Sequence, residues 1–409
     1  MVTGSRSKKI ETLLSRGVEE IIDKEHLKKR LLKGQRLRIK FGVDPSKPDI
    51  HLGHTVPLRK LREFQQLGHK VIFIIGDFTA RIGDPSGRSK TRPQLTVQEV
   101  NKNAKTYLDQ AGKVIDIKKV EIRRNSEWYD KMKPDDFIRL FSKITLARIL
   151  ERDDFQKRMK NNINIYPHEI IYPILQGYDS IVVESDVEIG GTDQKFNMLI
   201  GRRLQEKEGM EPQDIITVPL LVGLDGKNKM SKSLGNYVGI TESAFQQYGK
   251  IMSIPDNLIL DYFKLLTDVP LKEIAKMERD LKSKRVNPKE LKSFLAKEIV
   301  TFYHSKQKAE RAEREFERIF KEKKTPTKIP VCLLNKDTLN ILDLLTKTRL
   351  VSSRSEGRRL IEQKGVRIKF KDQESKIPIK NWQEEIKIKD GMILQVGKRK
   401  FVRIRKKLV

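Results

Sequence analysis

Cysteine and long apolar runs are the two scarcest features of this 409-residue chain. The single cysteine, Cys332, excludes an internal disulfide and a metal site built from several thiolates. The longest clear apolar run, Val71–Ile75, is far shorter than the roughly 20 residues that span a bilayer. The first nine residues also lack the apolar core of a secretory signal. We therefore expect a cytoplasmic protein with no membrane partner.

Acidic residues are too few to balance the basic ones. The chain has 85 Lys and Arg against 55 Asp and Glu, a net charge of +30, which favours a polyanionic partner. A lysine-rich surface also arises from adaptation to high temperature, so the distribution of the charge matters. The 69 residues from Ile341 to Val409 hold 20 basic and 8 acidic residues, a net charge of +12. This concentration predicts a polyanionic partner for the tail rather than a uniform bias of the surface.

A strand-to-helix turn near the N-terminus carries two histidines, His51 and His54, on either side of Gly53. Before it, Arg38–Pro45 has the apolar run and turn residues that end a buried strand. After it, apolar residues recur at helical spacing over Thr55–Leu67. A helix start suits phosphate, and a glycine there lets a planar group approach the backbone. Alone, the pattern also fits two ordinary histidines, and it has too few ligands for a metal site.

The segments that follow predict a parallel sheet. Lys70–Ile75 reads as a second strand and completes a β-α-β unit. The loops Gly76–Thr79 and Ile82–Arg88 should then face one cleft, because ligands lie at the carboxyl ends of parallel strands. Residues Val97–Asn161 read as a mainly helical insertion with one strand at Val120–Arg123.

One helix face in the next segment is polar but has no Lys or Arg. Tyr172, Gln176 and Asp179 follow one another at i, i+4 and i+7, between apolar neighbours. Such a stripe lines a polar pocket at least as readily as it forms a solvated face. A strand over Val182–Glu188, a loop over Ile189–Gln194, a helix over Lys195–Gln205 and a strand over Ile215–Val222 are expected next.

The C-terminal half changes character. Residues Lys229–Ser233 belong to a lysine-rich loop that we expect to be exposed and outside the core. Helical patterns then run from Thr241 to about Lys324, and Thr325–Pro330 has the composition of a linker. The tail predicts short helices over Leu339–Leu345 and from Ser353 to Ile361, followed by alternating strands.

Two stretches together resemble the signatures of the class I aminoacyl-tRNA synthetases. His51-Leu52-Gly53-His54 is similar to His-Ile-Gly-His, with Leu52 in place of the commoner isoleucine, and Lys229–Ser233 matches Lys-Met-Ser-Lys-Ser at all five positions. Within that class, the chain resembles the bacterial tyrosyl-tRNA synthetases over Phe41–Arg92, Tyr172–Asp179 and Gly190–Gln194. The stretch Ser353–Val366 is similar to an S4 RNA-binding domain.

The resemblance implies an α/β fold in three parts and a homodimer. Residues 1–240 would form a Rossmann-like catalytic domain, 241–330 an α-helical anticodon-binding domain with a linker, and 331–409 a small α+β S4-like RNA-binding domain. Such an enzyme activates L-tyrosine with ATP to tyrosyl-adenylate and pyrophosphate, then transfers tyrosine to the 3′ end of tRNA(Tyr). ATP would come with Mg²⁺, and no protein-bound structural metal is expected.

The resemblance also assigns four groups of site residues. The group that acts on the phosphates is His51, His54, Arg88, Arg92, Lys229 and Lys232. The ATP-binding group is Asp44, Gly53, Thr55, Gly190, Gly191, Asp193, Leu221, Val222, Met230 and Ser231. The tyrosine-binding group is Asp84, Tyr172, Gln176, Asp179 and Gln194, and the tRNA-binding group is Arg354, Arg358, Arg359 and Lys364. Asp179 matches the acceptor of the phenol hydroxyl, and such an acceptor left unpaired by phenylalanine rejects it by about 10⁵ without editing.

One position departs from the best-known bacterial branch, which has a tyrosine where this chain has Lys40, as in a second bacterial form. We expect no direct contact between Lys40 and the phenol. Two other functions stay open. A tryptophanyl-type enzyme shares the fold and both signatures, but the Tyr172-Gln176-Asp179 face and the S4-like tail disfavour it. An RNA-binding protein with an inactive synthetase domain is disfavoured by the intact signatures.

Overall fold

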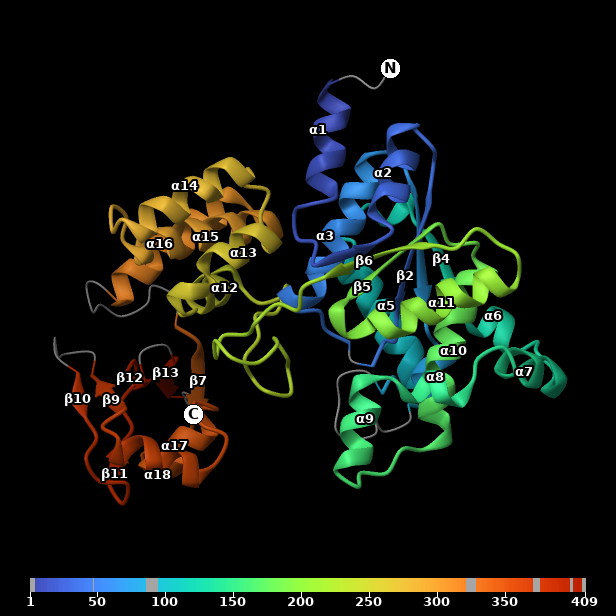
Figure 1. Ribbon diagram of the computed structural model, residues 1–409. Helices are drawn as coiled ribbons and strands as arrows, with labels where there is room; N and C mark the ends of the chain where they lie inside the picture. The colour runs from blue at the N-terminus through green and yellow to red at the C-terminus, as the bar shows by residue number, and fades with distance from the viewer. Residues whose placement is uncertain are drawn as a thin grey trace. The chain divides into compact units, whose positions relative to one another are not determined.

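The computed structural model describes residues 4–46, 48–85, 95–320, 329–370, 376–397 and 400–406. They divide into two compact units, Met1–Ala309 and Glu310–Val409, coloured from blue to orange and from orange to red in Figure 1. The first unit is built around a six-stranded sheet and the second around a five-stranded one. In the described part of the chain, no helix is both long and apolar enough to cross a membrane.

The large sheet of the first unit has the strand order β1-β6-β5-β2-β3-β4. Neighbouring strands are parallel, except that β1 is antiparallel to β6. The strands are β1 (Glu20–Ile22), β2 (Arg38–Val43), β3 (Lys70–Ile75), β4 (Glu121–Arg124), β5 (Val187–Gly191) and β6 (Asp214–Val218). Chain order reverses direction between β2 and β5, and in such sheets the ligand crevice opens at the carboxyl ends of the strands beside that switch point.

Helices cover both faces of this sheet, because its strands are apolar on both sides. On one face, Ile72 and Ile74 of β3 pack into an apolar cluster with α10 (Pro167–Val182) and α11 (Lys195–Lys207). On the other, Phe73 lies against Tyr107 of α5 (Val97–Ala111), whose ring centroid is also 6.3 Å from that of His54 in α3 (Leu52–Gln66). Close packing of α10 on α11 requires small residues, since a Cβ on Gly177 would lie 3.0 Å from the backbone nitrogen of Gly201.

The insertion between β3 and α10 is mainly helical, as predicted. Its helices besides α5 are α4 (Thr79–Ile82), α6 (Ser126–Tyr129), α7 (Pro134–Phe141), α8 (Leu146–Leu150), α9 (Asp153–Lys160) and the 3₁₀ turn η1 (Ile117–Lys119). The one strand among its described residues, β4, forms the edge of the sheet.

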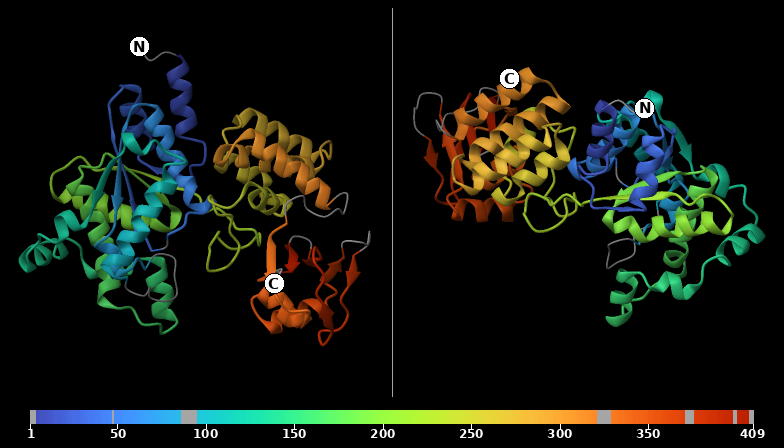
Figure 2. Two further views of the ribbon diagram at one scale, coloured as in Figure 1. Left: turned by 180° about the vertical axis from the view of Figure 1, so that it is seen from behind. Right: turned by 45° about the horizontal axis from the view of Figure 1, so that its top comes forward.

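A helical region completes the first unit, and Figure 2 shows its helices packed together. It comprises α12 (Ala244–Ile251), η3 (Asp256–Leu258), α13 (Ile259–Leu266), α14 (Leu271–Lys282) and α15 (Pro288–Tyr303), while α16 (Lys306–Phe320) crosses the boundary between the units. Arg16, between α1 (Gly4–Leu13) and α2 (Lys24–Leu32), joins this region to the sheet domain. Its guanidinium donates to four carbonyl oxygens at the end of α13, those of Phe263, Lys264, Thr267 and Val269.

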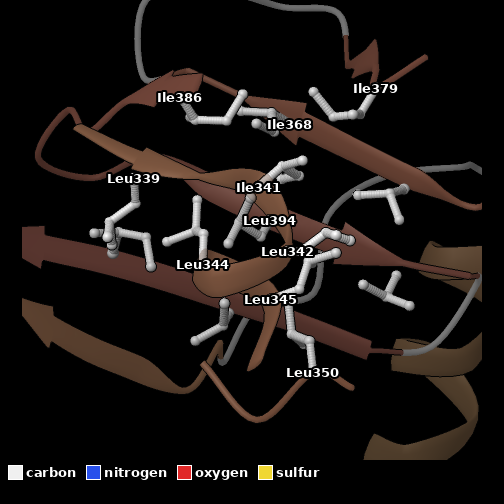
Figure 3. Close-up of a cluster of buried hydrophobic side chains, with 14 of the residues drawn as sticks. Leu339, Ile341, Leu342, Leu344, Leu345, Leu350, Ile368, Ile379, Ile386 and Leu394 are labelled. Carbon is white, nitrogen blue, oxygen red and sulfur yellow. The ribbon is translucent and has the colours of Figure 1, made fainter. Parts of the chain in front are cut away.

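The second unit has its own apolar core, drawn in Figure 3. Leu342 and Leu345 of α17 (Ile341–Lys347) point toward Leu394 of the five-stranded sheet, whose order is β10-β9-β12-β13-β7. The remaining elements are β7 (Val331–Leu334), β8 (Thr338–Asn340), α18 (Arg354–Glu362), β9 (Val366–Lys369), β10 (Ile377–Pro378), β11 (Glu385–Lys387), β12 (Ile393–Val396) and β13 (Lys400–Lys406). β11 and β8 form a separate two-stranded ladder.

The predicted α/β class and parallel sheet are confirmed, but several elements have other bounds. The strand expected over Ile215–Val222 is β6, which ends at Val218. The strand expected from Val182 begins only at Val187, because α10 continues through Val182. The next residue, Val183, is buried in the apolar cluster that α10 and α11 form with β3. An apolar run of that length does not separate a helix end from a strand. The expected loop from Ile189 starts as the end of β5, and only Thr192–Gln194 leaves the sheet, as the 3₁₀ turn η2. The linker at 325–330 lies mostly outside the described residues.

Candidate active site

A cavity of about 330 Å³ opens at the carboxyl ends of β2 and β5. Most of the residues that the sequence assigned to phosphate, ATP or tyrosine line it. They are Asp44, His51, Gly53, His54, Asp84, Tyr172, Gln176, Asp179, Gly190, Gly191, Asp193, Gln194, Leu221, Lys229, Met230 and Ser231. Segments far apart in the sequence therefore converge on one cavity at the switch point of the sheet.

The two histidines lie at the start of α3 because the chain leaves β2 through a turn and His51 caps the helix. The His51 backbone N–H donates to His54 Nδ1 at 3.2 Å, and the ring centroids are 3.8 Å apart. Burial, together with the nearby Lys232 and Lys229 ammonium groups, lowers the pKa of His54 to about 4. His54 is therefore neutral at physiological pH. Since its Nδ1 accepts a hydrogen bond, its Nε2 carries the proton and is a donor.

Gly53 provides the open space beside these rings. A Cβ at this position would lie 3.1 Å from the His51 ring and 3.5 Å from Met230 Cβ. Any side chain would therefore narrow the part of the cavity between the helix start and the lysine-rich loop.

The segment that follows the lysine-rich loop is tied to the helix start by backbone pairing. Leu52 N–H donates to Val238 O at 3.0 Å, and Ile240 N–H donates to Ile50 O at 3.2 Å. Asn236 holds the loop itself, since its Oδ1 accepts from the Ser231 N–H at 2.7 Å. These contacts bring the two sequence signatures together.

The expectation that this loop lies wholly outside the core was wrong for one residue. Met230 is buried and lines the cavity, while its neighbour Lys229 is exposed. The apolar side chain packs inward because Met230 N–H pairs with Leu221 O at 2.7 Å and sets the loop against the end of the sheet domain.

Both lysines of the Lys229–Ser233 signature meet carboxylates. Lys229 Nζ donates to Asp193 Oδ2 at 2.9 Å, and Lys232 forms an ion pair with Asp49, just before the first histidine. The Lys232 ammonium also lies 5.6 Å from the centroid of the Tyr237 ring. One lysine thus reaches the segment after β5 and the other reaches the segment before α3.

The polar face of α10 lines the cavity through a chain of hydrogen bonds. Tyr172 OH donates to Asp44 Oδ2 at 2.8 Å. Asn197 Nδ2 donates to Gln176 Oε1 at 2.8 Å and to Gln194 Oε1 at 3.2 Å. Gln194 in turn donates to Asp84 Oδ2 at 2.9 Å. These groups fix one another's orientation and leave a polar, anionic wall.

Asp179 lies deeper on the same face and is 4% exposed. Its carboxylate accepts from Trp128 Nε1 at 3.1 Å, Tyr129 OH at 3.0 Å and Asn125 Nδ2 at 3.4 Å. Burial raises the pKa of Asp179 to about 7, and the Lys40 charge and these hydrogen bonds keep it from rising further. Asp179 is thus a buried acceptor at the base of the cavity. With a pKa of about 7, its protonated and ionised forms are about equally populated at neutral pH.

Five assigned residues do not appear among the lining residues. Lys232 points to Asp49, the Thr55 hydroxyl donates to Leu52 O at 2.8 Å, and Val222 O accepts from Tyr262 OH at 2.6 Å. Arg88 and Arg92 lie outside the described residues. For Thr55 and Val222, the polar groups are already used within the fold.

Four residues, Glu188, Asn197, Asn125 and Gln213, were not predicted from the sequence, and no structural partner was predicted for Lys40. Glu188 lines the cavity, and Asn197 bridges Gln176 and Gln194. A signal was available for Asn197, which follows Gln194 by three positions at the start of a predicted helix. None of these residues belongs to either signature.

The four assigned tRNA-binding residues lie in the second unit and are all exposed. Arg354 pairs with Asp343, and Arg358 pairs with Glu362 at 3.0 Å while its guanidinium lies 4.5 Å from the centroid of the Trp382 ring. Arg359 is on the same helix, α18, and Lys364 follows it. They form a basic surface around one helix.

Among the described residues, one group of three could offer ligands to a metal ion, and it lies outside the cavity. It consists of Asp23, His26 and Asp214. His26 Nδ1 is already 3.0 Å from Asp214, and the Arg202 guanidinium lies 3.6 Å from Asp23. The group therefore reads as a charge-paired cluster that holds α2 to β6.

Known proteins share this sequence over nearly its whole length. Residues 32–321 match the family described as tRNA synthetases class I (W and Y). A tyrosine--tRNA ligase of Thermotoga maritima is 51% identical over 393 residues, which cover 96% of each chain. One of Dehalococcoides mccartyi is 50% identical over 96% of this chain and 98% of its own.

Solved structures share the fold. A C-terminally truncated mitochondrial tyrosyl-tRNA synthetase of Aspergillus nidulans superposes with a TM-score of 0.64 at 24% identity, over 78% of this chain and 95% of that one. The tyrosyl-tRNA synthetase of Archaeoglobus fulgidus gives 0.60 at 22% identity, over 75% and 99%. With the two signatures meeting in one cavity and half of all residues shared with bacterial relatives, the chain belongs to the class I aminoacyl-tRNA synthetases, and within them to the bacterial tyrosyl-tRNA synthetases.

Proposed function

We propose that this chain is a tyrosine--tRNA ligase that activates L-tyrosine with ATP and transfers it to the 3′ end of tRNA(Tyr). The observation that carries the proposal is the near-complete match to tyrosine--tRNA ligases at about half identity, with both signatures intact. The test is ATP–pyrophosphate exchange with each amino acid in turn. Exchange that requires tyrosine supports the proposal. Exchange with tryptophan would favour the tryptophanyl alternative, and no exchange would favour an inactive synthetase domain.

In the first step, the tyrosine carboxylate attacks the α-phosphorus of ATP and pyrophosphate leaves, so the protein supplies no nucleophile. What remains for the protein is to position the reactants and to stabilise charge on the phosphates. We assign the neutral His54, with its Nε2 proton, as a hydrogen-bond donor to that charge, and His51 as its neighbour on the same helix start. Lys229 and Lys232 hold the departing pyrophosphate, and Arg88 and Arg92 act on the same side.

The nucleotide lies between the helix start and the end of β5. Gly53, Gly190 and Gly191 leave room for the adenosine, and a Cβ on Gly191 would lie 2.8 Å from Asp193 Oδ1. Asp193 accepts from the ribose, while Leu221, Met230 and Ser231 contact the base side. Asp44 completes the group. Thr55 and Val222 support this site from behind, since neither lines the cavity.

Tyrosine lies along α10 with its phenol at Asp179. Tyr172, Gln176, Gln194 and Asp84 surround the ammonium group, which their oxygen-rich wall suits. Asp179 accepts from the phenol hydroxyl. Phenylalanine would leave this buried acceptor without that donor, and an unmet buried group of this kind costs binding strongly.

Magnesium would enter with ATP. The cavity offers the carboxylates of Asp44 and Asp193, and oxygen ligands are what Mg²⁺ prefers. However, Asp44 accepts from Tyr172 and Thr79, and Asp193 is paired with Lys229. We therefore infer that the phosphate oxygens of ATP hold the ion for the most part. When bound, it neutralises phosphate charge.

We propose that the chain has three domains, residues 1–240, 241–330 and 331–409, and that they have different roles toward tRNA. The helical middle domain would read the anticodon, and the basic C-terminal domain would hold tRNA phosphates through Arg354, Arg358, Arg359 and Lys364. The exposure of these four side chains and the tail's net charge of +12 support this assignment.

We also propose a cytoplasmic homodimer. Among the described residues of the insertion, seven large apolar side chains are exposed on the single chain: Val97, Ile122, Ile138, Leu146, Met159, Ile163 and Tyr166. Ile138 and Leu146 are 66% and 57% exposed. Large exposed apolar side chains are the kind of surface that an interface covers, and a second copy of the chain is the partner that the family implies.

A further inference from the structure

Lys40 is a buried charged residue in β2, between the apolar residues Ile39 and Phe41. It is 0% exposed and extends from β2 toward α10. Its ammonium donates to Gln176 O at 2.9 Å and Ser180 Oγ at 2.7 Å, and it lies 3.0 Å from Glu188 Oε1. An ammonium group has three donors, so these contacts use all of them.

Glu188 is the partner of Lys40 on the next strand. The two residues are paired in register between β2 and β5, and Glu188 is 2% exposed. Its Oε1 accepts from Gln176 Nε2 at 3.3 Å, and its Oε2 accepts from Gln213 Nε2 at 2.6 Å and Ser180 Oγ at 3.2 Å. A buried ion pair contributes little to stability, because the cost of desolvation offsets the attraction. Holding its neighbours in one conformation is therefore the better explanation for the Lys40–Glu188 pair.

The pair holds the turn of α10 that carries the selectivity residue. Gln176 and Ser180 are four residues apart and both contact the pair, and Asp179 lies between them in sequence. Tyr129 and Lys40 are the ionisable groups that act directly on the Asp179 carboxylate, and Trp128 and Asn125 also donate to it. Tyr178 acts on Tyr129, and Glu188 faces the Lys40 ammonium. Lys40 is the single cation among these described groups.

We propose that Lys40 is a positioning residue for amino-acid selectivity, which fixes the Gln176–Ser180 turn through two hydrogen bonds and through its ion pair with Glu188, and which places a positive charge near Asp179. Lys40 itself makes no contact with the phenol and does not line the cavity. Its effect reaches tyrosine through Asp179 and Gln176. This inference rests on the proposed function, since it explains how tyrosine is chosen.

The test is a double variant, Lys40→Met with Glu188→Gln, which removes the cation without leaving a buried charge unpaired. The matched control is Lys60→Met with Glu63→Gln. Lys60 is also buried, and its ammonium also has three oxygen partners, but they are Leu13 O, Arg16 O and Glu63, away from Asp179. Both variants lose one buried lysine and its carboxylate partner.

We measure kcat/KM for tyrosine and for phenylalanine in ATP–pyrophosphate exchange from about pH 6 to about pH 8.5. If Lys40 keeps Asp179 ionised, the Lys40 double variant loses about tenfold in kcat/KM for tyrosine near pH 6, for each unit by which the pKa of Asp179 rises. The loss shrinks toward the alkaline end, and the tyrosine-to-phenylalanine ratio falls as well. The Lys60 control lowers thermal stability but leaves the pH profile and the ratio unchanged.

Two outcomes overturn the proposal: an unchanged profile and ratio in a folded Lys40 double variant, or the same shift in the Lys60 control. If the Lys40 double variant does not fold, Glu188→Gln alone decides, because it leaves the cation in place without its counter-charge. Its pH profile should move to lower pH, and a profile that stays or moves upward overturns the charge effect. Absence of tyrosine-dependent exchange in the native chain would instead refute the proposed function.

Discussion

Lys229 Nζ donates to Asp193 Oδ2 at 2.9 Å, and this ion pair connects the lysine-rich loop to the segment that follows β5. Lys232 makes the equivalent contact with Asp49, two residues before His51. Each signature lysine is therefore already held by a carboxylate next to a segment proposed to bind ATP. Phosphate oxygens of an incoming nucleotide would compete with these carboxylates for the same ammonium groups.

The first prediction concerns the transition state of adenylate formation. His54→Ala and Lys232→Ala should each lower the rate of tyrosyl-adenylate formation by about 10²–10³, because each removes one preorganised donor. The Kd for tyrosine should change little, since neither residue belongs to the tyrosine-binding group. Pre-steady-state rates measure the effect, and His26→Ala, outside the cavity, is the control. Near-native rates for both variants would rule out these roles.

The second prediction concerns side-chain selectivity. Asp179→Ala removes the proposed acceptor for the phenol hydroxyl, so kcat/KM for tyrosine should fall sharply while that for phenylalanine changes far less. The gap between the two amino acids, of order 10⁵ for a site of this kind, should narrow. The measurement is the ratio of kcat/KM values in pyrophosphate exchange. An unchanged ratio would mean that another group recognises the phenol.

The third prediction follows from the raised pKa of Asp179. A carboxyl with a folded-state pKa of about 7 binds its proton more tightly in the folded chain than in the unfolded one. Its contribution to stability is therefore present at low pH and is lost as pH rises from about 4 to about 7. Relative to Asp179→Asn, the unliganded native chain should lose stability over that range, by a few kcal/mol at most. Thermal or urea unfolding at both pH limits measures the difference.

If the native chain instead gains stability relative to Asp179→Asn as pH rises from about 4 to about 7, the pKa of Asp179 is not raised. A constant difference between native chain and Asp179→Asn from about pH 4 to pH 8 would mean that Asp179 titrates at an ordinary value.

His54 should give the opposite dependence of stability on pH. Its pKa is lowered to about 4, so the neutral ring contributes stability above its unfolded value and loses it as pH falls toward 4. His54→Gln should therefore reduce sensitivity to acid.

Periodicity predicted the parts of the fold in which each local pattern matched its final environment. The strand Lys70–Ile75 was predicted with the bounds that the structure has, because its apolar run is short and bounded by polar turns. The end of α10 was not, because Val182 and Val183 are equally suited to a strand. β1 and β7 were missed because each is a short edge strand, with few side chains in a core.

The residues of the candidate site likewise divide into those that the sequence predicts and those that it does not. His51, Gly53 and Lys229 were found because they belong to short motifs whose spacing is meaningful by itself. Glu188 and Asn125 were missed because their roles depend on partners far away in sequence. A lysine in one buried strand and a glutamate in another were both visible in the sequence. Only the order of the strands, with β2 beside β5, shows that Lys40 and Glu188 pair.

The fourth prediction tests the proposed dimer. Ile138→Lys would place a charge in the exposed apolar group of the insertion, so the dimer should dissociate at micromolar concentration. Light scattering during size-exclusion chromatography measures the mass. Leu271→Lys, at an exposed apolar position on α14 outside the insertion, is the matched control and should leave the mass unchanged. A monomeric native chain, or a dimer that survives Ile138→Lys, would place the interface elsewhere or remove it.

The last prediction separates activation from tRNA binding. A chain that ends at Pro330 keeps the first unit and all of α16, while it lacks the second unit's apolar core and its basic helix α18. None of the residues that line the cavity lies beyond that point. The shortened chain should therefore keep tyrosine-dependent pyrophosphate exchange and lose most tRNA charging.

Salt dependence distinguishes an RNA-binding tail from one that only supports folding. Each phosphate contact adds about one unit to the slope of log affinity against log salt concentration, so residual tRNA binding by the shortened chain should show a shallower slope. In the full chain, Arg358→Gln with Arg359→Gln should reduce the slope by about two and leave pyrophosphate exchange unchanged. If the shortened chain is folded and charges tRNA at the full rate, the basic surface around α18 does not bind tRNA.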